Sequence, residues 1–247
     1  MVVRELLVKG ILSKSKVFDY VVNPYIGCQH GCTYCYARFM KRFTGHTEPW
    51  GEFVDVKINA PELLKHQITR ASPGRVWVSG VCDPYQPLEK QYMLTRKCLD
   101  ILLAHGWEVT VQTKSPLVLR DVELLQEAPR LEVGLTITTT DEAIRQLFEP
   151  KAPSIEARLH ALEELHNAGI RTFAMIAPLL PGAEGLAAKL DDKVDYVLID
   201  RMNYHYGDRV YRKYGLASAF SDAFFFSAAR QLASAFAKRD IECQILF

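Results

Sequence analysis

Three cysteines crowd into one short segment, and their type and spacing suit metal chemistry. Cys28, Cys32 and Cys35 follow the pattern C-x3-C-x2-C. Three thiolates on one tight loop can hold three corners of a 4Fe–4S cubane, which leaves the fourth iron without a protein ligand. Gly27 and Gly31 suit a backbone that must wind closely around such a group. The segment predicts a cluster with one iron open to a further ligand.

The alternative is a structural zinc site, which is closed by four protein ligands. The only nearby fourth ligand is His30, which stands between two of the cysteines, and the remaining cysteines are distant in sequence. The iron–sulfur interpretation is therefore favoured over zinc. We expect His30 to be a packing residue of the loop.

Apolar strand-like runs alternate with amphipathic helical stretches around this loop, which indicates parallel strands joined by right-handed crossovers. The cysteine loop follows the first run directly. In such folds the chemistry lies on the loops after each strand. The predicted strands are Asp19–Asn23, Arg75–Gly80, Glu108–Thr113, Leu131–Thr138, Arg171–Ala177 and Tyr196–Asp200.

Three stretches have helical periodicity. Leu94–His105 ends before Gly106, a second helix begins after the N-cap Ser154 and ends before Gly169, and a third runs from about Ser221 to Lys238. Six strands with these helices fit a partial (β/α)6 TIM-like barrel, and eight units would not fit. We expect a single domain over residues 1–247, with an N-terminal extension (1–22), a barrel core (23–200) and a C-terminal loop, helix and tail (201–247).

Composition limits the class of protein. The net charge of +1 gives the whole molecule little attraction for nucleic acid or anionic lipid, so any such partner must meet a local patch. The N-terminus lacks the apolar core of a secretion signal, and no apolar run is long enough to span a membrane. Six cysteines with three clustered are typical of a reducing compartment. The prediction is a cytoplasmic protein without a membrane partner.

The cysteine segment, Gly27-Cys-Gln-His-Gly-Cys-Thr-Tyr-Cys-Tyr-Ala-Arg38, resembles the radical S-adenosylmethionine (SAM) superfamily, in particular the branch that contains spore photoproduct lyase. Weaker markers of that branch are Cys82-Asp-Pro-Tyr-Gln-Pro-Leu-Glu89, Thr113-Lys-Ser115 and the segment Glu149–Leu159. The likeness runs from about Asn23 to Gly182.

This resemblance implies a 4Fe–4S cluster and S-adenosylmethionine as cofactors. The cofactor's amino and carboxylate groups would chelate the open iron, and one electron would release a 5′-deoxyadenosyl radical that abstracts hydrogen from a substrate. It also implies an electron donor of the flavodoxin or ferredoxin kind. Two alternatives stay open: repair of a DNA lesion like that of spore photoproduct lyase, and an iron–sulfur protein without turnover that serves electron transfer or sensing.

Two residues are predicted to bind the cofactor on the strength of this resemblance. Tyr34 stands where family members bring a backbone group to the adenine edge, although it could equally be a packing aromatic. Lys114 ends a strand on the same side as Thr110 and Gln112, a polar face that would line the barrel mouth. The matching lysine of the lyases pairs with the cofactor carboxylate. A solvated surface lysine is the alternative.

Cys82 and Asp83 follow the second predicted strand and are further predicted cofactor contacts. The lyases carry a serine at the position of Cys82, and Gly80 stands where they carry the cysteine that donates hydrogen. The missing cysteine argues against photoproduct repair. Cys82 remains a candidate catalytic hydrogen donor, a cofactor contact or an inert thiol.

Thr136 and Thr138 give the fourth predicted strand one polar face, and their hydroxyls are predicted to meet the cofactor; threonine is also simply a good strand former. Arg158 lies on a predicted helix, from which it could reach the barrel mouth, but a surface position is favoured. Cys98 and Cys243 lie in apolar patterns and are expected in the core.

Asp200, Asn203 and Tyr204 follow the last predicted strand and are predicted to line the substrate pocket. The stretch from Arg201 to Tyr214 interleaves tyrosines with cations, a composition that suits stacking on bases and pairing with phosphates. Because the chain is nearly neutral, a loop that closes over some other substrate is favoured over nucleic acid. The sequence leaves the substrate unidentified.

Overall fold

A computed structural model describes all residues from Met1 to Phe247. By its internal contacts the chain forms two compact units. The first unit comprises Met1–His30 and Ala37–Val133, and the second comprises Gly31–Tyr36 and Gly134–Phe247. The chain therefore passes from the first unit to the second and back again within the cysteine segment.

The larger sheet of the first unit contains β2 (Leu12–Lys14), β3 (Tyr20–Val22), β6 (Arg75–Val78) and β7 (Glu108–Thr113). β2 is antiparallel to β3, whereas β3, β6 and β7 run parallel. Val22, Val76, Val78, Val109 and Val111 on these three strands are fully buried. Valine is enriched in strands, and these apolar residues are the signal from which the sequence predicts the three strands.

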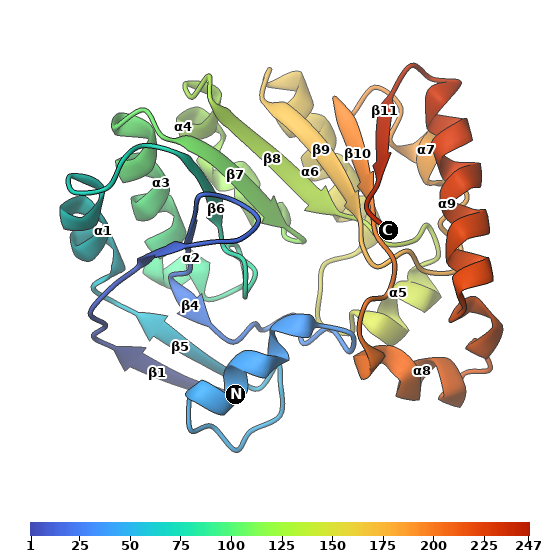
Figure 1. Cartoon of the computed structure of the whole chain (residues 1–247), viewed down its shortest axis with the longest axis horizontal. Helices are drawn as coiled ribbons and strands as arrows, with labels where there is room; N and C mark the ends of the chain where they lie inside the picture. Colours follow the sequence, from blue (N-terminus) through green and yellow to red (C-terminus); the bar gives the residue numbers. More distant parts are fainter. The chain divides into compact units, whose positions relative to one another are not determined.

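A second sheet of the first unit is formed by β1 (Val2–Leu6), β5 (Phe53–Lys57) and β4 (Tyr25–Ile26). β5 lies between the other two, parallel to β1 and antiparallel to β4 (Figure 1). None of these three strands was predicted from the sequence. β1 is mostly exposed and β4 has two residues, so neither produces a clear periodic pattern.

The helices of the first unit are α1 (Ala60–Ile68), α2 (Glu89–Tyr92), α3 (Leu94–Ala104) and α4 (Val122–Gln126), with the 3₁₀ helices η1 (Tyr36–Phe43) and η2 (Pro116–Asp121). α3 follows the prediction and stops before Gly106, which has a φ of +70°. Its apolar face is buried and includes Cys98, so the prediction that Cys98 is a core residue is confirmed.

The strands of the second unit are β9 (Arg171–Ile176), β10 (Tyr196–Ile199) and β11 (Glu242–Ile245), which run parallel side by side (Figure 1). β8 (Leu131–Thr136) carries the chain across the boundary between the units. A Cβ on Gly134 would lie 2.2 Å from the ring of Phe173, so this position requires glycine. β11 was expected to be an irregular tail, and it is an edge strand. Cys243 on it is partly exposed, so its assignment to the core was wrong.

The helices of the second unit are α5 (Glu142–Phe148), α6 (Ile155–Asn167), α7 (Leu186–Lys189), α8 (Asp208–Lys213) and α9 (Asp222–Ala237), with the 3₁₀ turns η3 (His205–Gly207) and η4 (Ala217–Ala219). The Ser154 hydroxyl caps α6 as predicted, and the Ser221 hydroxyl caps α9, whose start was predicted at about this residue. α9 packs against β11 (Figure 1). None of the helices is long and apolar enough to cross a membrane.

The six predicted strands correspond to β3, β6, β7, β8, β9 and β10, and each boundary differs by at most two residues. Helices separate successive parallel strands from β6 to β10. The predicted fold class, a partial (β/α)6 TIM-like barrel, is confirmed.

Candidate active site

The loop that carries Cys28 is held by side chains that bond to its backbone. Gln86 accepts a hydrogen bond from the Gln29 amide at 3.0 Å and donates to the Gly27 carbonyl at 3.3 Å. In return, the Leu88 amide donates to Gln29 Oε1 at 2.6 Å. Gln86 is fully buried, so water does not compete for these bonds. The segment after β6 thus fixes the conformation of the first cysteine's loop.

Glycine is required at position 27 of this loop. Its φ is +90°, which disfavours other residues, and a Cβ there would lie 2.4 Å from the Phe53 carbonyl oxygen. The loop therefore approaches β5 more closely than any side chain would allow.

Asp83 connects the cysteine loop to the ends of β6 and β7. Its carboxylate accepts from the Thr113 hydroxyl at 2.6 Å, the Lys114 amide at 2.8 Å and the Tyr85 amide at 2.9 Å. His30 Nε2 lies 3.2 Å from the same carboxylate. Burial alone would raise the pKa of Asp83, but His30 and these donors lower it to about 2. The carboxylate is thus ionised and already engaged by the protein.

Cys82 lies beside Asp83 and packs against a cluster of Tyr25, Val54, Val56 and Leu94. Burial raises the pKa of its thiol to about 12, although the Ser79 hydroxyl and the Lys57 ammonium oppose the shift. At neutral pH the sulfur therefore keeps its hydrogen. Such a thiol is a poor nucleophile but remains able to give up a hydrogen atom.

Gly80 lies two residues before Cys82. The atoms around it leave little space for a side chain. A Cβ would lie 3.2 Å from Val21 Cγ2 and 3.4 Å from the Trp77 ring. A cysteine could enter here only if these neighbours moved.

Glu89 ends the same segment and was missed by the sequence analysis. It is fully buried, accepts from the Tyr25 hydroxyl and from the Thr95 amide at 3.0 Å, and pairs with Arg120 at 3.0 Å. Tyr25 comes shortly before Cys28, so this carboxylate anchors the strand that leads into the motif. No local signal distinguishes a buried glutamate from an exposed one in the sequence.

The second half of the motif is anchored in the second unit. The amide and the hydroxyl of Thr33 donate to the Phe148 carbonyl at 2.8 and 3.2 Å. Tyr34 is buried, and its hydroxyl donates to Glu149 Oε1. Burial and then the neighbouring carboxylate raise the pKa of Tyr34 well above its ordinary value, so the phenol stays protonated as a donor.

Glu149 also forms an ion pair with Arg158, and both side chains are fully buried. Arg158 Nη2 lies 2.5 Å from Glu149 Oε2. Nη1 donates to the Thr136 carbonyl at 3.0 Å, and Nε and Nη2 donate to the Pro153 carbonyl at 3.0 and 2.7 Å. The expectation that Arg158 lies at the surface was wrong, because the face of α6 that carries it packs against the end of β8.

Thr136 and Thr138 lie at this end of β8, and both are buried. The Thr138 hydroxyl donates to Glu149 Oε1 at 3.4 Å. The Thr138 hydroxyl thus lies among the residues that fix Tyr34, and contact of the two threonine hydroxyls with a cofactor stays a prediction.

Asp200 follows β10, and Asn203 and Tyr204 extend from it. The Asp200 carboxylate accepts from the Arg201 amide at 2.8 Å and from the Asn203 side chain at 2.7 Å. Burial raises its pKa above the ordinary value. Tyr204 stacks between Tyr36 and Tyr206, with ring centroids 6.2 and 5.9 Å apart. Tyr36 follows Cys35 directly, so this ladder joins the motif to the predicted substrate residues.

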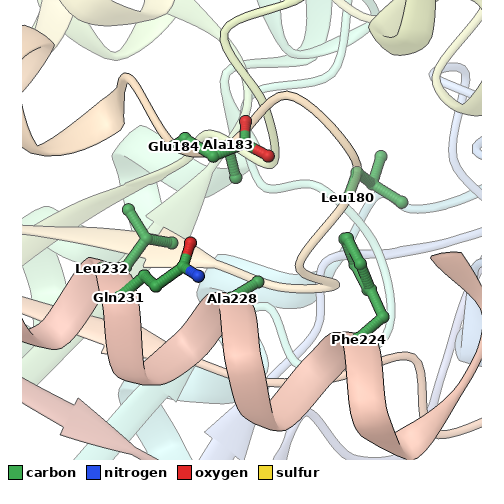
Figure 2. Close-up of a pocket in the computed structure, with 7 residues that line it drawn as sticks. All are labelled: Leu180, Ala183, Glu184, Phe224, Ala228, Gln231 and Leu232. Carbon is green, nitrogen blue, oxygen red and sulfur yellow. The ribbon is translucent and has the colours of Figure 1, made fainter.

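A cavity of about 210 Å³ also lies in the second unit. Figure 2 shows α9 on one side of it and the loop after β9 on the other. It is lined by Leu180, Ala183, Glu184, Phe224, Ala228, Gln231 and Leu232. None of the predicted site residues is among them, so this cavity does not define the candidate site.

The three cysteine thiols of the motif are chemically suited to bind an iron–sulfur cluster. Cys28 and Cys32 are buried and Cys35 is partly exposed. The Cys35 amide donates to the Cys32 carbonyl at 3.2 Å, which makes a tight turn between the last two thiols. Three soft sulfur donors on a loop anchored at both ends suit iron.

Comparison with known proteins supports the same interpretation. The family model described as the radical SAM superfamily matches residues 22–184. An uncharacterized protein of Methanocaldococcus jannaschii, MJ0683, is 42% identical over 162 residues, which are 66% of this chain and 61% of the relative. An uncharacterized protein of Mycobacterium tuberculosis, Rv2578c, is 32% identical over 200 residues, or 76% of this chain and 58% of the relative. The chain thus spans about three-fifths of the length of these relatives.

A solved structure of spore photoproduct lyase in complex with a dinucleoside spore photoproduct superposes with a TM-score of 0.72 at 14% identity. The superposition covers 99% of this chain and 82% of the lyase chain. At this identity the likeness shows the fold alone.

Proposed function

Because the chain belongs to the radical SAM superfamily, we propose that it is an enzyme that cleaves S-adenosylmethionine and abstracts hydrogen from a substrate. Members of the superfamily use a 4Fe–4S cluster together with S-adenosylmethionine. The observation that carries the proposal is the anchored motif. Gln86 and Asp83 hold its first half, and Glu149 holds its second half through Tyr34.

In this proposal Cys28, Cys32 and Cys35 hold the cluster. When bound, the cluster and its cofactor supply a 5′-deoxyadenosyl radical that abstracts hydrogen from the substrate. The protein provides the rest: it fixes the three thiols, orients the cofactor and keeps water away from the buried loop. His30 is proposed to hold the cysteine loop in place rather than to bind the cluster, because it is buried beside the Asp83 carboxylate.

Cofactor binding is assigned to Lys114, Thr136, Thr138 and the backbone of Tyr34. Asp83 accepts a hydrogen bond from the Lys114 amide, which fixes the backbone of this partly buried lysine directly after β7. Charge-assisted pairing with the methionine carboxylate is the role proposed for its ammonium group. Asp83 acts through this contact as a positioning residue, because its oxygens are already engaged.

Cys82 is assigned as a hydrogen donor to a substrate radical. The support is its protonated thiol, which can transfer a hydrogen atom without first losing a proton. Such a transfer would leave a thiyl radical on Cys82, and the thiol would be restored by a hydrogen atom from 5′-deoxyadenosine or by one electron from the reductant and one proton.

Asp200, Asn203 and Tyr204 are assigned to the substrate. Tyr204 is 52% exposed within the tyrosine ladder, so part of its ring is accessible to a substrate. DNA photoproduct repair is not favoured, because Gly80 has little space for a donor side chain and the net charge is only +1. An electron carrier without turnover is also disfavoured, since it needs no anchored lysine at the barrel mouth.

Anaerobic incubation of the reconstituted protein with S-adenosylmethionine and dithionite tests this function. We expect 5′-deoxyadenosine and methionine to form in equal amounts, and no thymidine to be restored when dinucleoside spore photoproduct is added. A cluster that reduces normally while S-adenosylmethionine stays intact would support the electron carrier instead. Thymidine formation over several turnovers would support lesion repair.

Replacing Lys114 with methionine should weaken S-adenosylmethionine binding. The loss of one charge-assisted contact costs about 1.5–3 kcal/mol, or roughly ten- to hundredfold in affinity. The measurement is a titration followed by the cluster's spectral response. Lys90→Met, which removes an exposed lysine on α2, is the matched control. Equal affinities in the two variants would show that Lys114 does not bind the cofactor.

A further inference from the structure

The helix η1 begins directly after the third cysteine and exposes aromatic rings together with cations. Its sequence, Tyr-Ala-Arg-Phe-Met-Lys-Arg-Phe, contains no acidic residue. Phe43 is 67% exposed, although phenylalanine normally avoids water. The Arg42 guanidinium lies 4.8 Å from the Phe43 ring and 5.4 Å from the Phe39 ring. Phe39, Lys41, Arg42 and Phe43 are called the η1 surface below.

The structure holds these groups in place. Lys41 Nζ donates to the Thr47 carbonyl at 2.9 Å, and the Thr44 hydroxyl donates to the Lys41 carbonyl at 2.8 Å. These bonds fix the turn that ends η1. The Phe43 ring thus stays exposed at a defined position, next to the half-buried Phe39. An apolar group kept in water beside cations is typical of an interaction surface.

Chain continuity places the η1 surface close to the proposed cluster. A 3₁₀ helix rises about 2 Å per residue, so the seven residues from Cys35 to Arg42 span on the order of 14 Å. Electron transfer falls off steeply with distance, so a protein that reduces the cluster must dock near its cysteines. The η1 surface meets that requirement by its position in the chain.

We propose that the η1 surface is the docking site for an acidic one-electron carrier protein of the flavodoxin or ferredoxin class. This inference rests on the proposed function. The carrier is oxidised by one electron, and the cluster is reduced from the 2+ to the 1+ state. Arg42 and Lys41 pair with the carrier's carboxylates, and Phe39 and Phe43 supply a small dry contact. Transient redox complexes have small interfaces of this kind.

Charge complementarity favours this occupant. The net charge of the whole chain is +1, so attraction for an acidic protein must come from a local cationic patch. A nucleic acid could also bind to cations and aromatic rings. Its bases, however, stack on aromatic ring faces that are open to solvent, and here the Arg42 guanidinium lies over both phenylalanine rings.

The test compares Arg42→Glu and Phe43→Ser with Arg70→Glu, which makes the same charge change at an exposed arginine just beyond α1. The probe is a bacterial flavodoxin, with affinity for the reconstituted protein measured by fluorescence anisotropy at low salt. We expect about tenfold weaker binding in the two η1 variants and little change in Arg70→Glu. Stopped-flow reduction of the cluster by flavodoxin hydroquinone should slow by a similar factor, while reduction by dithionite stays at the wild-type rate.

Equal flavodoxin affinity in Arg42→Glu and the wild type would overturn the proposal, and so would an equal loss in Arg70→Glu. A single-stranded oligonucleotide that displaces flavodoxin and loses affinity in Arg42→Glu would assign the η1 surface to nucleic acid instead. The dithionite measurement separates this inference from the proposed function. If the wild type fails to cleave S-adenosylmethionine with dithionite, the function fails, whatever the affinity for flavodoxin.

Discussion

Replacing Cys32 with alanine is expected to abolish the 4Fe–4S cluster, so that iron falls from about four atoms per chain to background after anaerobic reconstitution. Cys32 is buried and stands in the middle of the motif. Two remaining thiols cannot hold three corners of a cubane, and no other residue of the loop supplies a thiolate. Iron and sulfide analysis, together with the electron paramagnetic resonance signal of the reduced protein, measure the outcome.

Cys98→Ala and Cys243→Ala are the matched controls. Cys98 is buried on α3 in the first unit, and Cys243 lies on the edge strand β11 of the second. Both variants should keep wild-type iron content. Iron that survives in Cys32→Ala, or that is lost in Cys243→Ala, would contradict the assignment of the ligands.

Replacing Arg158 with methionine is expected to lower the free energy of unfolding by about 3–5 kcal/mol, because it leaves the buried Glu149 carboxylate without its cation. The carbonyls of Thr136 and Pro153 lose their donors as well. For a chain of this length each kcal/mol shifts the melting temperature by roughly 2–4 °C, so the total shift is on the order of 10 °C. Urea unfolding followed by circular dichroism measures the change.

Two further variants separate the buried pair from a general packing defect. Glu149→Gln added to Arg158→Met removes the stranded charge and should recover part of the lost stability. Lys193→Met breaks a partly exposed pair with Glu163, and such pairs contribute little to stability. If Arg158→Met unfolds at the same urea concentration as Lys193→Met, the buried pair does not stabilise the second unit.

The parallel strands were predictable from the sequence because local patterns encode them. Val76, Val78, Val109 and Val111 recur at every second position, as expected of a strand with a buried face, and Ser154, Gly106 and Gly169 mark helix ends. Spacing along the chain also predicted the cysteine motif, since three ligands on one loop need no distant partner. The placement of Lys114 and Asp83 after strand ends came from the same local reasoning.

The side chains that anchor the motif depended on the tertiary structure. Arg158, Glu149 and Glu89 look like solvated charges in the sequence, and all three are buried. Glu149 bonds to Tyr34, 115 residues away, and Glu89 bonds to Tyr25, 64 residues away. A charged residue carries no local sign of burial, because its partners are set by how strands and helices pack. The sequence therefore determined which atoms can bind the cluster, and only the tertiary structure decided what holds them, because charge pairing across the fold is non-local.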